Sequence, residues 1–147
     1  MSSFTNALIL QDTGDGKHWL LHDDIEYHVG EESSGVFVPA QKGEKSDLFS
    51  IWIWRTGTGN AAALIHDLLY RRGVVHYRSP GGHVNIHKIG RHAADKIFFE
   101  ALGVLGVNKV RRVVLYLGVR LFGGWGWRRS QAKRDAYFNQ FKEDQGA

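Results

Sequence analysis

A histidine and an aspartate, His66 and Asp67, stand side by side in the apolar segment AAALIHDLLYRRG (61–73) and are the residues best suited to chemistry. Imidazole and carboxylate groups bind ions such as Mn, Fe, Zn or Mg, and a bound ion lowers the pKa of a coordinated water until it can attack a phosphoester or an amide. Asp95, in a second segment of helical character, could supply a more distant carboxylate. The pattern therefore permits a metal-assisted hydrolase with His66, Asp67 and Asp95 as metal ligands.

A structural role for the same pair is open as well. Adjacent residues on a helix point about 100° apart, so His66 and Asp67 would face one small ligand only at the edge of the helix. His66 and Tyr70 are i, i+4 neighbours and could simply pack together. A buried Asp67 could accept hydrogen bonds from backbone N–H groups or from Arg91, because polar groups in an apolar helix must be satisfied.

Three further histidines occur in the segment HYRSPGGHVNIH (76–87), at positions 76, 83 and 87. Metal binding needs three or four converging ligands, and an irregular segment provides no geometry for that. We therefore expect a solvent-exposed loop whose histidines titrate near neutral pH. The sequence contains no phosphate-binding loop and no GxSxG motif.

Two tryptophans followed by two arginines form the motif GGWGWRR, with Trp125 and Trp127 ahead of Arg128 and Arg129. Such residues could stack on bases, lie at a membrane interface or contact a protein partner. The alternative is an apolar plug that closes the last helix against the sheet.

Charge is unevenly distributed over the 147 residues, which have the length of a single domain. Residues 1–107 carry ten Lys/Arg and twelve Asp/Glu, net −2, whereas residues 108–147 carry nine and three, net +6. The basic part predicts either a solvated helix face or a contact with nucleic acid, anionic lipid or an acidic protein. There is no cysteine, which excludes disulfides and thiolate zinc sites. The apolar run 113–127 is too short and too interrupted for a membrane span, and the N-terminus lacks the basic region of a secretory signal.

The elements that must position these residues are β-rich first and helical later. Short runs of β-forming residues separated by turn signals predict about four strands in residues 1–55. Three helices are expected between 60 and 123, the first capped by Asn60 and Gly73, the second over 91–106, and the third beginning after Asn108 and stopping at Gly123–Gly124. Residues 73–90 are expected to form a long loop or loose hairpin, and the basic polar tail 124–147 to contain a fourth helix. The order predicts an α+β fold, a small antiparallel sheet packed on three to four helices.

Three segments, in this order, resemble the DUF1353 family of small proteins, encoded mainly by tailed bacteriophages and prophages and of unknown function. They are KSDLFSIWIW (45–54), AAALIHDLLYRRG (61–73) and the run from Arg91 to Gly123. The chain departs from the family pattern at Ser46, which replaces a Thr, and after Ser50, where no Pro follows. The family's polar motif positions correspond here to Asp47, His66, Asp67, Tyr70, Arg91 and Asp95.

The resemblance implies a phage origin but no reaction, and it leaves open whether the protein is an enzyme. One hypothesis is an accessory protein without established catalysis, virion-associated or located in the host cytoplasm, which contacts a phage or host protein through its basic, Trp-rich C-terminal third. Nucleic acid is a further possible partner. The alternative hypothesis is a small hydrolase in which Asp47, His66, Asp67 and Asp95 are catalytic and Arg91 binds an anionic group. A divalent metal is expected only under this alternative, and the sequence identifies no other cofactor.

Overall fold

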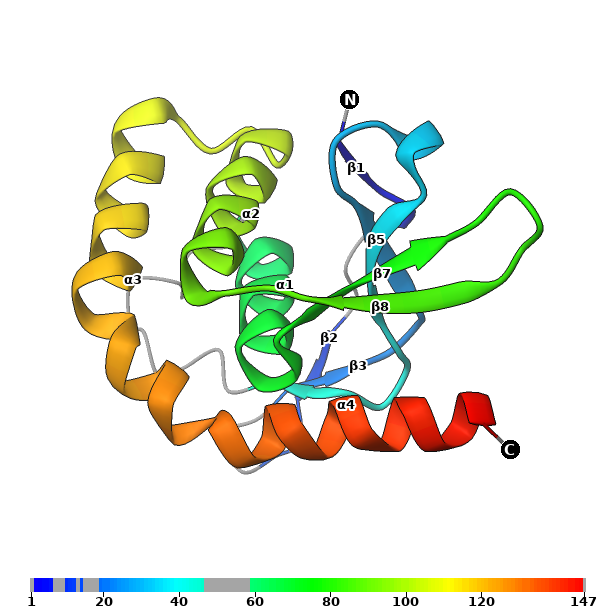
Figure 1. Cartoon of the computed structure of the whole chain (residues 1–147). Helices are drawn as coiled ribbons and strands as arrows, with labels where there is room; N and C mark the ends of the chain where they lie inside the picture. Colours follow the sequence, from blue (N-terminus) through cyan, green and yellow to red (C-terminus); the bar gives the residue numbers. More distant parts are fainter. Residues whose placement is uncertain (1, 7–9, 13, 15–18, 47–58, 147) are drawn as a thin grey trace.

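The strands form two antiparallel sheets. The computed structural model describes residues 2–6, 10–12, 14, 19–46 and 59–146 (Figure 1). The larger sheet has the order β1 (Ser3–Phe4), β4 (Ile25–His28), β5 (Val36–Ala40), β7 (Val74–Arg78) and β8 (Val84–Lys88). The smaller sheet has the order β2 (Leu10–Asp12), β3 (Trp19–Leu21) and β6 (Lys45–Ser46), and a single 3-10 turn, Glu32–Ser34, precedes β5 among these residues.

Alternation along the central strands decides which residues of the larger sheet face the main core. In β4, Ile25 and Tyr27 are buried and stand opposite Ala40 and Val38 of β5, which are buried too. Side chains on a strand point alternately to opposite faces, so these four occupy one face. That face packs against the main helical core. The other face is covered as well, because Phe37 and His76, which stand opposite each other on β5 and β7, are also buried.

Four helices follow or interrupt the strands, and they are α1 (Asn60–Arg72), α2 (Arg91–Val104), α3 (Lys109–Arg129) and α4 (Gln131–Gly146). Helix α1 is central and contacts β5 and each of the other three helices. Helix α3 runs along the outer edge of the molecule beside α2, and α4 crosses below α1 (Figure 1). No helix of the described ranges is long and apolar enough to cross a membrane.

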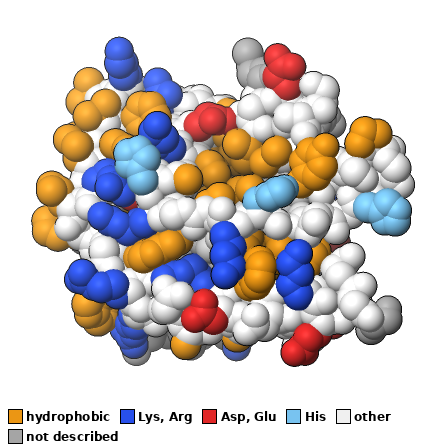
Figure 2. Space-filling view, viewed as in Figure 1, with side chains coloured by type: hydrophobic (Ala, Val, Ile, Leu, Met, Phe, Trp, Pro, Cys, Tyr) orange, Lys and Arg blue, Asp and Glu red, His pale blue; other side chains and the backbone are white. Residues whose placement is uncertain are grey.

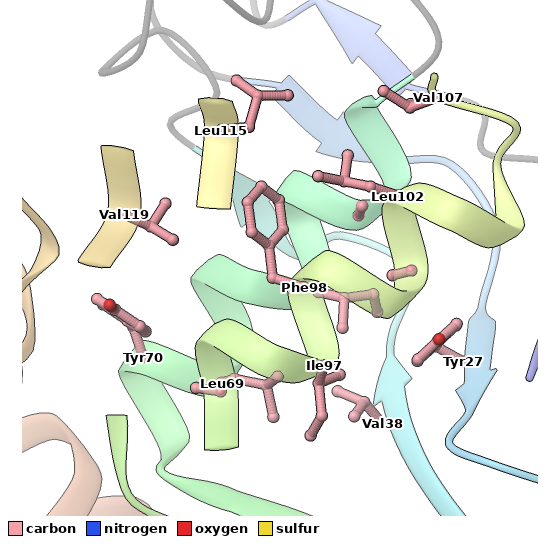
Figure 3. Packing of buried hydrophobic residues seen from close by; sticks show 14 residues of the cluster. Tyr27, Val38, Leu69, Tyr70, Ile97, Phe98, Leu102, Val107, Leu115 and Val119 are labelled. Carbon is pink, nitrogen blue, oxygen red and sulfur yellow. The ribbon is translucent and has the colours of Figure 1, made fainter. Parts of the chain in front are cut away.

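The main core lies where α1, α2 and α3 meet (Figure 3). Leu69 of α1, Phe98 and Leu102 of α2, and Leu115 and Val119 of α3 are all buried in it. Each apolar side chain of this size contributes roughly 1.5–3 kcal/mol when fully buried. Much of the stability therefore depends on α3 staying docked, although only two of its residues are buried.

The predicted α+β class is confirmed, and so are the left-handed Gly73 that ends α1 and the Asn108 cap of α3, whose Oδ1 accepts from the Arg111 amide. The predicted fourth helix is present as α4. The N-cap of α1 is Gly59 rather than Asn60, and no side chain caps that end. The expected long loop or loose hairpin is a regular hairpin, β7–β8, which forms one edge of the larger sheet.

The prediction that the third helix stops at Gly123–Gly124 is wrong, because α3 continues to Arg129. A Cβ on Gly123 would lie 2.5 Å from the Tyr70 hydroxyl oxygen, and one on Gly124 would meet the Arg91 guanidinium at 3.8 Å. Gly123 therefore allows the helix to approach Tyr70 closely, whereas a side chain at Gly124 would meet Arg91 in ordinary contact. Packing outweighs the roughly 1 kcal/mol by which each glycine disfavours a helix.

Candidate functional site

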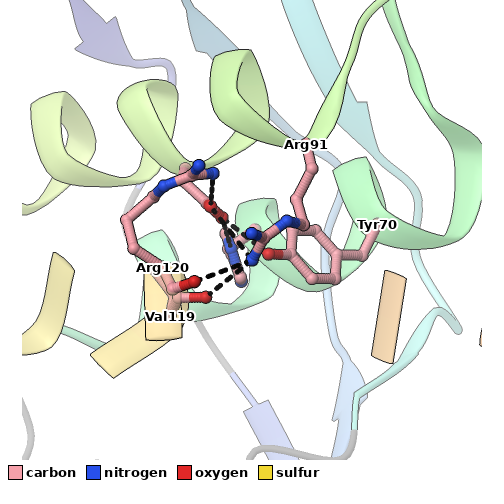
Figure 4. A network of polar contacts seen from close by, with 6 residues as sticks. Tyr70, Arg91, Val119 and Arg120 are labelled. Atoms are coloured by element: carbon pink, nitrogen blue, oxygen red, sulfur yellow. Dashed lines mark hydrogen bonds and ion pairs between the residues drawn. The ribbon is translucent and has the colours of Figure 1, made fainter. Parts of the chain in front are cut away.

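Asp95 is the centre of a polar network, and its side chain is completely buried. His66 Nε2 donates to Asp95 Oδ1 at 2.8 Å, and the Tyr70 hydroxyl donates to the same oxygen at 2.7 Å. Arg120 Nη1 donates to Oδ2 at 2.8 Å. One carboxylate on α2 therefore ties α1, through two residues one turn apart, to α3 (Figure 4).

The network favours the ionised form of Asp95. Burial alone would raise the pKa of the carboxyl, but hydrogen bonds from His66, Tyr70 and Arg120 outweigh it and hold the pKa below its ordinary value. Burial and the neighbouring carboxylate raise the pKa of the Tyr70 hydroxyl, which stays protonated as a donor. The site is thus a carboxylate surrounded by donors.

Aromatic rings enclose the histidine. The His66 ring lies 4.2 Å from the Tyr70 ring and 4.7 Å from the Phe98 ring, measured between centroids, and only 12% of the side chain is exposed. Trp127 packs edge-on against Tyr70, with centroids 5.2 Å apart. The expected packing of His66 on Tyr70 is therefore present, and rotation of either ring is restricted.

Two buried or half-buried arginines donate to carbonyl groups of α3, and one of them also donates to a carbonyl of α1. Arg91 Nη1 lies 4.0 Å from Asp95 Oδ2 and donates to the carbonyls of Val119 and Arg120, at 3.3 and 3.0 Å. Arg134 of α4 donates through Nη1 to the carbonyls of Tyr70 and Trp127, at 3.1 and 2.6 Å.

Tyr70 and Trp127 belong to the last turns of α1 and α3, where free carbonyls and the helix dipole attract a positive charge. The buried Arg134 guanidinium also lies 3.8 Å from the Trp127 ring centroid. Two helix ends and a ring therefore stabilise this cation, and it fastens α4 to both helices.

The sequence-predicted residues separate into two groups. His66, Tyr70, Arg91 and Asp95 come together, whereas Asp67 is partly exposed and pairs with Arg71 at 3.1 Å. Asp47 lies outside the described residues, as do Ser50, Trp52 and Trp54.

The two tryptophans of GGWGWRR face opposite ways. Trp127 packs inward against Tyr70 of α1 and Arg134 of α4, rather than against the sheet as the plug alternative expected, whereas Trp125, Arg128 and Arg129 are exposed. The Arg129 guanidinium lies over the Trp125 ring at 4.9 Å.

Sequence reasoning missed Arg120 and Arg134. Arg120 had a usable signal, because it interrupts an otherwise apolar run, and a charge at such a position needs a buried partner. Arg134 had none, since it stands in a polar helix between other charged residues.

The expectation that residues 76–87 form an exposed, titrating loop is wrong for His76. This side chain is buried on β7, where its Nε2 lies 3.0 Å from the Tyr137 hydroxyl of α4. Burial, helped by the charge of Arg72 and opposed by Glu26, lowers the pKa of His76 to about 4. His76 therefore packs α4 onto the sheet as a neutral ring.

The chemistry open to the Asp95 site is limited by its cations. In the part of the chain that the structure describes, no group of three or more His, Asp or Glu residues could hold a metal ion. A divalent ion at Asp95 would have to displace Arg120 and would be repelled by Arg91 as well.

A separate cleft of about 170 Å³ lies between α4 and β7–β8, lined in part by Arg72, Lys88 and Arg134. Its cations are already engaged, Arg72 with Glu44, Arg134 with carbonyls and Lys88 over the Phe138 ring. It therefore provides no ready set of donors for an anionic ligand.

Fold and site together define an α+β protein in which His66, Tyr70 and Arg91 converge on the buried Asp95 carboxylate. The model of the family described as "Protein of unknown function (DUF1353)" matches residues 19–119, and the chain belongs to this family. Neither the comparison with curated proteins nor the comparison with solved structures gave a match.

Proposed function

We propose that the chain is a bacteriophage-encoded accessory protein without catalysis of its own, which docks through the outer face of α3 onto a component of the virion or of the host cell. The resemblance to a family encoded mainly by phages supports the origin. The observation that carries the proposal is the closed network at Asp95, where both carboxylate oxygens accept from α1 or α3. His66 and Tyr70 then serve to hold Asp95, which in turn holds Arg120 of α3 in place.

The docking part of the proposal rests on the apolar side chains that α3 exposes to solvent. Helix α3 directs Leu115 and Val119 into the core and exposes several large apolar side chains on its other side. Exposed apolar patches larger than a few hundred Å² are uncommon on monomers and mark interaction surfaces. The Asp95 network therefore contributes to docking indirectly, because it fixes the orientation in which α3 presents these side chains.

The hydrolase alternative has one observation in its favour. An ionised Asp95 that accepts from His66 Nε2 fixes the tautomer of the ring and leaves Nδ1 as the basic nitrogen. This is the orientation that an acid–base histidine requires. It supports a metal-free version better than a metal-assisted one, because Arg120 occupies the position of a cation beside the carboxylate.

Asp95→Asn tests the proposal against this alternative. We expect a loss of about 2–4 kcal/mol in the free energy of unfolding, because Asn keeps the shape of Asp but loses charge-assisted bonds. Asp144→Asn, on the exposed face of α4, is the matched control and should stay within about 0.5 kcal/mol.

Titration calorimetry with Mn²⁺ and Zn²⁺, and assays with p-nitrophenyl acetate and phosphate, complete the test. We expect neither stoichiometric metal binding nor turnover. Turnover that His66→Gln abolishes while the melting temperature is unchanged would contradict the proposal, as would metal binding lost in Asp95→Asn.

A further inference from the structure

The outer face of α3 carries a continuous apolar strip. Its members lie three or four residues apart, the spacing of one helix face, except for the adjacent Val113 and Val114, and they are Val110, Val113, Val114, Leu117, Leu121 and Trp125. At 1.5 Å per residue the strip is about 22 Å long. Phe122 stands beside it, 80% exposed. Phe122 and Trp125 alone present about 300 Å², since aromatic side chains have roughly 150–250 Å² of surface each.

The charges of α3 are of one sign and lie at the ends of this strip. The 21-residue helix contains six Lys/Arg and no Asp or Glu. Lys109, Arg111 and Arg112 are in its first turn, and Arg128 and Arg129 are in its last turn. The only cation between them, Arg120, turns inward to Asp95. The middle of the strip is therefore free of exposed charge, and both ends are basic.

These charges decide between the possible occupants of the strip. Apart from Arg120, two copies joined along α3 would bring ten cations together with no acidic residue of α3 to pair with them, so a symmetric dimer is disfavoured. A partner that matches this surface must therefore combine negative charge with an apolar region.

The shape of the surface favours a bilayer over an acidic protein. Helix α3 lies at the outer edge of the molecule, and apolar side chains line that edge with Lys and Arg beside them (Figures 1 and 2). A protein partner would need a groove to receive a convex helix, whereas a lipid surface deforms around it. Trp, Phe and Leu are the side chains that enter the acyl boundary, while terminal Lys and Arg reach anionic headgroups.

We infer that α3 is a membrane-surface anchor, which lies flat on an anionic lipid bilayer with Leu121, Phe122 and Trp125 at the acyl boundary. This inference rests on the proposed function, since it names the component of the host cell to which α3 docks. The polar tie at Asp95 then has a further consequence, because it turns Arg120 away from the strip and keeps the apolar middle uncharged.

Sedimentation of the full chain with vesicles of phosphatidylcholine and phosphatidylglycerol, compared with phosphatidylcholine alone, tests the inference. We expect binding to the anionic vesicles that weakens as NaCl rises, and little binding to the neutral ones. Leu121→Asp should lower partitioning at least about tenfold, the value of burying one leucine. Arg128→Glu should lower it roughly tenfold or more, since each cation near the surface contributes about a factor of five.

Lys42→Glu, the same charge change in the exposed turn between β5 and β6, is the matched control and should bind as the unmodified chain does, apart from the effect of net charge. An equal loss in Lys42→Glu and Arg128→Glu would overturn the inference, because attraction would then depend on net charge alone. Full binding by Leu121→Asp would overturn it as well.

Failure to bind anionic vesicles at low salt would also overturn the inference, and an acidic protein would then be the partner class to test. The inference would be overturned as well if the chain formed a dimer in solution and Leu121→Asp converted that dimer to a monomer. None of these outcomes depends on metal binding or turnover at His66, so failure of the anchor is distinguishable from failure of the non-catalytic proposal.

Discussion

Gly123→Ala is the most direct test of how closely α3 approaches the polar network. The added methyl group would lie 2.5 Å from the Tyr70 hydroxyl oxygen and 3.3 Å from Tyr70 Cζ. The hydroxyl cannot move away freely, because it donates to Asp95 at 2.7 Å and the ring is held between His66 and Trp127. The substitution should therefore break the Tyr70–Asp95 hydrogen bond or push α3 outward.

The magnitude follows from opposing contributions. Alanine in a helix interior is favoured over glycine by about 1 kcal/mol. A hydrogen bond to a charged group is worth about 1.5–3 kcal/mol, and overpacking a core costs about 1–3 kcal/mol. We expect Gly123→Ala to lower the free energy of unfolding by about 0.5–2 kcal/mol, the cost of the lost hydrogen bond less the gain in helix propensity. Gly118→Ala, in the same helix with open space around it, should raise it by about 1 kcal/mol.

Urea-induced unfolding followed by circular dichroism measures both variants, with unchanged m-values as the check that the transition remains comparable. A double-mutant cycle with Tyr70→Phe then removes the nearest atom, and the cost of Gly123→Ala should fall by more than about 1 kcal/mol. The reasoning is refuted if Gly123→Ala is as stabilising as Gly118→Ala, or if its cost is the same with and without the Tyr70 hydroxyl.

Two other positions give predictions on stability. The pKa of His76 in the folded chain, about 4, is below its ordinary 6.5, so the unfolded chain takes up the proton first as pH falls. Neutral His76 therefore makes its full contribution to the free energy of unfolding above about pH 6.5. As the pH falls from about 6.5 to 4 this contribution is lost, and the loss reaches about 3 kcal/mol. In His76→Gln this part of the pH dependence should be absent from melting curves at pH 7, 5.5 and 4.5, and an identical slope in both proteins would contradict the assignment. Arg134→Met removes the bonds to the Tyr70 and Trp127 carbonyls and should cost roughly 2–4 kcal/mol in urea unfolding. Lys133→Met, its exposed neighbour, should change stability by less than about 0.5 kcal/mol, and equal effects of the two substitutions would argue against the role of Arg134.

The polar motif was predictable as a set of residues but not as an arrangement. Asp95 was expected as the distant ligand of a site centred on His66 and Asp67, and it is instead the buried centre, while Asp67 pairs with Arg71. Residue types indicate which groups can interact. Which of two adjacent polar side chains turns inward depends on how the helix is rotated about its axis relative to its neighbours. His66 and Asp67 point about 100° apart around that axis, so only one of them can face the core.

The sequence by itself determined the α+β class, the cap at Asn108, the left-handed Gly73 and the family, because these depend on local patterns of residues. Only the tertiary structure decided that α3 passes through Gly123 and Gly124, and that Arg120 and Arg134 hold helices together. The physical reason is that close approach to Tyr70 and the pairing of buried charges are interactions between segments distant in the chain. They outweigh local propensity, and no window of the sequence contains both partners.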